Sequence, residues 1–102
     1  MKLYKLEGHK PVLVEDVIEW ARWYETAERH VALKTIGVVR ISTVFLSIDH
    51  SFAFTGVDEE PILFETMVFG GKYDQYTDRY HTWEEAEEGH KKAVQMVKDG
   101  IL

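Results

Sequence analysis

Three ionisable side chains occupy positions where the surrounding pattern favours apolar residues: His50, Glu65 and His90. Glu65 interrupts an apolar, strand-like run, and His90 interrupts the apolar stripe of a C-terminal helical segment. A buried charge is costly unless it is paired or hydrogen-bonded, so each of these groups needs a partner or water. If the three converge, they would form an acid/base or ligand-binding cluster, with Asp49 and Arg79 as neighbouring charges.

A purely structural explanation is the more common one for each residue taken alone. A glutamate in a half-buried strand is usually satisfied by arginine, tyrosine or backbone partners, and a histidine on a helix stripe is usually a hydrogen-bonded core residue. Catalysis is therefore not the first expectation. The catalytic alternative is a small hydrolase or isomerase that uses His50 and Glu65 as an acid/base pair.

Other chemistry has little support in the sequence. There is no cysteine, and the five histidines show no i,i+4 pair, His-x-His or HExxH spacing, so neither a metal nor a cofactor is expected. No glycine-rich phosphate loop and no GxSxG motif occur. Tyr73, Tyr76 and Tyr80, with Arg79, could stack on a nucleobase, although a cross-strand aromatic ladder is the more common arrangement.

The composition favours one acidic domain over residues 1–102, with 12 Lys and Arg against 18 Asp and Glu and a formal net charge of -6. Binding to nucleic acid needs a basic face, so no nucleic-acid partner is expected. Acidic residues in 58–60 and 84–88 could mimic a phosphate backbone, but a solvated loop and helix-terminal charges explain them more simply. Neither a membrane span nor a signal peptide is found, so we expect no membrane partner and a cytoplasmic location.

The periodicity of apolar residues predicts the elements that would position these side chains. We expect strands at 3–6, 11–14, 31–35, 38–48, 62–69 and 73–81, and helices at 16–29 and 82–100. Gly70-Gly71 is interpreted as a two-residue turn that places Glu65 opposite Tyr76. Thr82 and Glu85 have the spacing of a capping box. The order predicts an α+β fold: an antiparallel β-meander of about four main strands plus a short N-terminal hairpin, with two helices packed on one face.

Three segments carry a family resemblance: STVFLSIDHSF at 42–52, PILFETMVFGG at 61–71 and RYHTWEEAEEGH at 79–90. On these motifs the chain resembles a family of short uncharacterised proteins of bacteriophages and prophages. The family pattern often has glycine where this chain has Ser47. The resemblance implies a small protein that acts by binding, either to a host protein or to a small signal molecule.

These observations lead to the expectation of a small, non-catalytic, phage-type binding protein, with a nucleotide-like signal as one candidate ligand. Its site would be lined by Asp49, His50, Glu65, Arg79, Tyr80 and His90. A site on so small a domain would be shallow unless a second subunit completes it, so a homodimer is a further expectation. The alternative is a protein–protein inhibitor that blocks a host factor with an aromatic surface of Trp23, Phe52 and Phe54.

Overall fold

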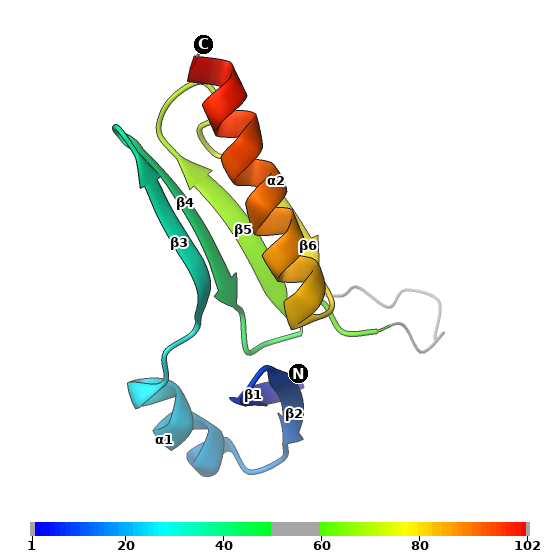
Figure 1. Cartoon of the computed structure of the whole chain (residues 1–102). Helices are drawn as coiled ribbons and strands as arrows, with labels where there is room; N and C mark the ends of the chain where they lie inside the picture. Colours follow the sequence, from blue (N-terminus) through cyan, green and yellow to red (C-terminus); the bar gives the residue numbers. More distant parts are fainter. Residues whose placement is uncertain (1, 50–59, 102) are drawn as a thin grey trace.

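The chain forms a four-stranded antiparallel sheet, a separate two-stranded hairpin and two helices (Figure 1). The computed structural model describes residues 2–49 and 60–101. The hairpin consists of β1 (Leu3–Glu7) and β2 (Lys10–Val14), and the sheet has the order β3 (His30–Ile36), β4 (Val39–Phe45), β5 (Phe64–Phe69), β6 (Thr77–Tyr80). The helices are α1 (Val17–Thr26) and α2 (Trp83–Ile101). The predicted α+β class, with its meander and N-terminal hairpin, is confirmed.

The helix α2 lies across one face of the four-stranded sheet and is in contact with all four strands. Its start is the predicted capping box, in which the Glu85 backbone N–H donates to Thr82 Oγ1 and the Thr82 N–H donates to Glu85 Oε1, both at 3.1 Å. The buried stripe of α2 comprises Ala86, Gly89, His90, Ala93 and Val97. No helix in the described ranges is long and apolar enough to cross a lipid bilayer.

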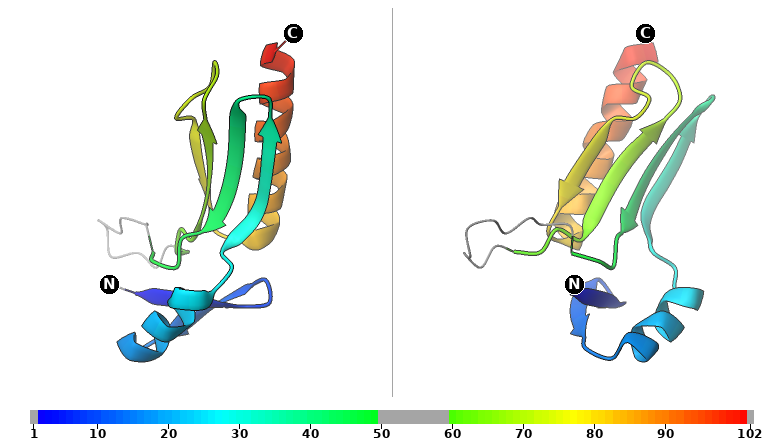
Figure 2. Two further views of the ribbon diagram at one scale, coloured as in Figure 1. Left: turned by 90° about the vertical axis from the view of Figure 1, so that its left-hand side faces the viewer. Right: turned by 180° about the vertical axis from the view of Figure 1, so that it is seen from behind.

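The helix α1 packs against the hairpin and not on the sheet face that α2 covers, which differs from the expected arrangement (Figure 2). None of its residues is fully buried, and Val17 and Ile18 are 63% and 64% exposed. Two tryptophans of α1 attach this helix to the hairpin and to the end of β4. Trp20 Nε1 donates to the Tyr4 carbonyl at 3.1 Å, and the ring of Trp23 meets Phe45 edge-on at 5.9 Å. Apolar side chains on α1, Val17 and Ile18 among them, are therefore left facing solvent.

The hairpin is joined to the sheet just beyond the end of β4. The Tyr4 N–H donates to the Ser47 carbonyl at 2.8 Å, and Leu3 bridges Ile48 in antiparallel fashion. Ser47 has a φ of 64°, in the left-handed region that favours glycine. The chain therefore turns sharply at Ser47, at the point where it meets β1.

The strands β5 and β6 pair as predicted, but the predicted register is wrong. Glu65 lies opposite Arg79, not opposite Tyr76, because residues 70–76 form a longer loop instead of a two-residue turn. Asp74 Oδ1 accepts a hydrogen bond from the Gly70 N–H at 2.6 Å and thereby closes this loop. Gly70, Gly71 and Gln75 all take positive φ angles within it. The backbone bonds from the Gln75 N–H to the Val68 carbonyl and from the Val68 N–H to the Tyr76 carbonyl hold the same register.

Candidate functional site

A layer of polar side chains crosses the interface between α2 and the sheet. Thr43 on β4, Thr66 on β5 and His90 on α2 are all buried there, and His90 is 8% exposed. Apolar clusters lie on both sides of the layer, one around Ile41 and Val97 and the other around Phe45 and Ala86. A polar group in such a place needs internal hydrogen bonds.

The layer is a continuous hydrogen-bonded chain. The Tyr80 hydroxyl donates to Thr66 Oγ1 at 3.1 Å, the hydroxyl oxygens of Thr66 and Thr43 lie 2.5 Å apart, and Thr43 Oγ1 lies 2.8 Å from His90 Nδ1. Gly89 makes room for it, because a Cβ there would overlap the Tyr80 hydroxyl. The chain thus joins β6, β5, β4 and α2 in one network.

Burial sets the charge states at both ends of this network. Burial lowers the pKa of His90 below its ordinary value and so favours the neutral imidazole. Burial also raises the pKa of Tyr80, which therefore keeps its proton over the physiological range, although its bond to Thr66 acts in the opposite direction. The network therefore consists of neutral groups.

His90 opens onto a groove of about 390 Å³ between α2 and the edge strand β3. We call this the basic groove; its lining residues are Leu33, Lys34, His90, Lys91, Val94, Gln95 and Lys98. Three of the seven are lysines and none is acidic, on a chain whose net charge is -6. Its volume lies near the lower end of the roughly 300 to 1,000 Å³ typical of ligand pockets. The basic groove is thus an open, positively charged depression whose lysines are exposed.

The other flank of α2 has the opposite charge. There a groove of about 470 Å³ is lined by Asp78, Tyr80, Glu84, Glu85, Glu88, Gly89 and Lys92. Tyr80 belongs to this acidic groove, while His90 belongs to the basic one. The buried hydroxyl chain therefore runs beneath α2 from one groove to the other.

Of the residues proposed from sequence, the structure brings Tyr80 and His90 together and separates Glu65 from them. On β5 the side chains of Phe64, Thr66 and Val68 are buried towards α2, so Glu65 projects from the opposite face. Its Oε2 lies 2.9 Å from Arg79 Nε, and the Glu65 side chain is 16% exposed. Glu65 and Arg79 thus form an ion pair remote from His90.

The remaining predicted residues lie beyond β4. Asp49 Oδ1 accepts a hydrogen bond from the Ile62 N–H at 3.0 Å and so ties the segment before β5 to the end of β4. His50 lies outside the described residues, as do Phe52 and Phe54. Whether His50 approaches any other site residue therefore stays a prediction.

Sequence reasoning missed Thr43, Thr66 and the three lysines of the basic groove. The threonines gave a signal, because each interrupts the apolar face of its strand as His90 interrupts the face of α2. The lysines gave none, since Lys91 and Lys98 look like ordinary surface charges of a helix and Lys34 is remote in sequence. Their common location follows only from the packing of α2 beside β3.

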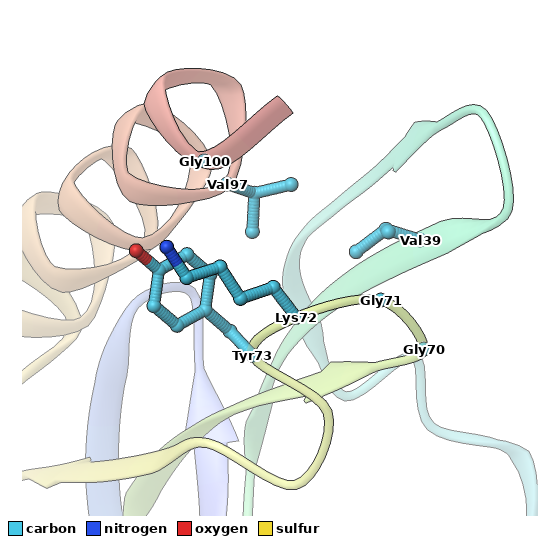
Figure 3. A pocket seen from close by; sticks show the side chains of 7 residues that line it. All are labelled: Val39, Gly70, Gly71, Lys72, Tyr73, Val97 and Gly100. Atoms are coloured by element: carbon cyan, nitrogen blue, oxygen red, sulfur yellow. The ribbon is translucent and has the colours of Figure 1, made fainter. Parts of the chain in front are cut away.

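Two further cavities in the described residues are weaker candidates. A pocket of about 60 Å³ lies between the loop 70–76 and the end of α2, where Tyr73 and the stem of Lys72 lie together beneath Gly100 (Figure 3). It is too small for most ligands. A second groove of about 400 Å³ contains His9 and Trp83, whose rings stack at 3.9 Å, so the chain itself covers the aromatic face.

Among the described residues, the tyrosines do not form a ladder and no metal centre is present. Tyr73 lies in the loop and Tyr80 faces α2, so a continuous tyrosine ladder does not form. Within residues 2–49 and 60–101, no group of three histidine or acidic side chains could hold a metal ion.

Comparisons of this chain with protein-family models, curated proteins and solved structures found no match.

Proposed function

We propose that this protein is a small, non-catalytic, phage-type binding protein of the cytoplasm that holds a small anionic molecule in the basic groove. The observation that carries the proposal is the convergence of Lys34, Lys91 and Lys98 around the buried His90. Lysines from β3 and α2 meet there although the protein as a whole is acidic. Leu33 and Val94 add apolar surface for the body of an organic ligand.

The chemistry of the site supports binding more than turnover. Thr43 Oγ1 lies 2.8 Å from His90 Nδ1, a distance typical of a nucleophile and its base, but Thr43 and Thr66 are fully buried, so no substrate can reach their hydroxyls. The hydrolase alternative needs Glu65 as an acid or base, but Arg79 holds that carboxylate on the other face of the sheet. The aromatic-surface alternative needs Trp23, and that ring packs against the core residue Phe45.

Native mass spectrometry can test the proposal before the ligand has been identified. The purified protein would be exposed to a small-molecule extract of bacterial cells, and its mass compared before and after. We expect a stoichiometric added mass that is lost in the variant Lys91→Glu/Lys98→Glu. The control Lys2→Glu/Lys72→Glu makes the same charge change at exposed lysines outside the basic groove and should keep the added mass. An added mass that survives in both variants would contradict the proposal.

A further inference from the structure

The order of donors in the buried chain determines which nitrogen of His90 carries the proton. Each hydroxyl has a single proton to donate. The contacts of Thr43 with Thr66 and with His90 Nδ1 are each compatible with either direction. Because Tyr80 donates to Thr66, the order that gives every hydroxyl proton of the chain an acceptor runs from Thr66 to Thr43 and from Thr43 to His90 Nδ1. Nδ1 is then an acceptor, and in the neutral imidazole the proton resides on Nε2.

Nε2 is the nitrogen left for the basic groove. His90 lines that groove, and its one hydrogen-bond contact among the described residues joins Nδ1 to Thr43 Oγ1, so Nε2 has no partner there. With this order of donors, an uncharged N–H faces a groove whose titratable lining residues are Lys34 from β3 and Lys91 and Lys98 from α2. The three charged ammonium groups and the Nε2–H of the neutral imidazole all donate hydrogen bonds, and none of these four groups accepts one.

We propose, on the basis of the function given above, that the basic groove takes the phosphoryl group of a small organic phosphate, and that the hydroxyl chain from Tyr80 fixes His90 as an Nε2–H donor to it. The cationic side chains that line the groove are all lysines. Ammonium groups are point charges that can surround a tetrahedral oxyanion from several directions, and lysine is a common phosphate ligand. Thr43, Thr66 and Tyr80 are positioning residues in this arrangement.

A pair of probes that differ only in the anion tests the ligand class. Phenyl phosphate and benzoate share a ring, so their affinities, measured by calorimetry at one pH and ionic strength, report on the anionic group. We expect phenyl phosphate to bind at least about tenfold more tightly than benzoate, a difference of about 1.4 kcal/mol. Equal or tighter binding of benzoate in the groove would overturn the phosphoryl assignment and leave the proposed function standing. If neither probe binds, both proposals fail.

The role of the hydroxyl chain has its own readout, the tautomer of His90. Nitrogen NMR of the imidazole in the ligand-free protein should show the proton on Nε2, and a proton on Nδ1 would overturn the inference without reference to any ligand. Thr43→Val keeps the side-chain shape but removes the donor to Nδ1. We expect it to give a mixture of tautomers and to weaken phenyl phosphate binding several-fold.

The matched control is Thr35→Val, which makes the same chemical change at an exposed position of β3. It should leave both the tautomer and the affinity unchanged. If Thr43→Val does not fold, Tyr80→Phe serves instead, because it removes the first donor of the chain while retaining the ring that packs in the core. An unchanged tautomer in a folded Thr43→Val or Tyr80→Phe variant would also overturn the role of the chain.

Discussion

Thr66 is the residue on which the buried chain depends, since its hydroxyl both accepts from Tyr80 and contacts Thr43. A buried polar group that loses its partner costs about 1 to 3 kcal/mol. We predict that Thr66→Val lowers the free energy of unfolding by an amount in this range, measured by urea denaturation, because the Tyr80 hydroxyl is left without an acceptor. The exposed Thr35→Val on β3 should change it by less than about 0.5 kcal/mol. Equal effects would show that the chain adds nothing to stability.

Ser47 presents the opposite case, a residue that the fold accepts at a cost. Its φ of 64° is unfavourable for a side chain, and its buried Oγ has no hydrogen-bond partner in the described structure. We predict that Ser47→Gly raises the free energy of unfolding by about 1 kcal/mol. Ser42→Gly, within the regular part of β4, should lower it by a similar amount. A destabilised Ser47→Gly protein would mean that the hydroxyl has a partner.

At the scale of elements, the contact between α2 and β6 requires a residue without a side chain at position 89. Alanine is favoured over glycine within a helix by about 1 kcal/mol. Even so, we predict that Gly89→Ala is destabilising, because its Cβ would overlap the hydroxyl and ring of Tyr80. Thermal unfolding measures this directly. A higher melting temperature for Gly89→Ala would show that Tyr80 can move aside without loss.

The elements themselves were largely predictable, because strand and helix periods are local signals. The capping box of Thr82 and Glu85 and the buried position of His90 were correct for that reason. The register between β5 and β6 was not, since Gly70-Gly71 resembles a tight turn and the bond from Gly70 to Asp74 is invisible in the pattern. That error is why the sequence did not place Arg79 opposite Glu65.

The site was only half predictable, for a geometric reason. Glu65 and Thr66 are adjacent in sequence, yet successive strand residues face opposite sides of a sheet, and the apolar neighbours of Glu65 suggested the wrong side. Tyr80 and His90 do join one network, but the lysines beside His90 are brought together only by tertiary packing. Charge on a helix surface does not reveal which strand will lie next to it.

At the scale of the whole molecule, His90 couples folding to pH. Its pKa in the folded protein is lowered, so the unfolded chain binds the proton more readily. The stabilisation is therefore fully present above the unfolded pKa of about 6.5 and is lost as the pH falls towards the lower folded value. We predict that the urea midpoint declines between about pH 7.5 and 5.5, and declines less in His90→Gln.

The control for this pH dependence is His30→Gln, at an exposed histidine of β3 paired with Glu28. It should retain the wild-type decline in the urea midpoint. Identical slopes for wild type and His90→Gln would contradict a neutral, buried His90.

The two flanks of α2 carry opposite charge, so an anion should bind at the basic groove and not at the acidic groove. The most direct measurement is amide chemical-shift mapping during a titration with inorganic phosphate. We predict saturable shifts at residues 33–34 of β3 and 90–98 of α2, with little change at 84–88. The absence of shifts up to about 10 mM phosphate, or shifts centred on the hairpin or the acidic groove, would contradict the assignment of the basic groove as the binding site.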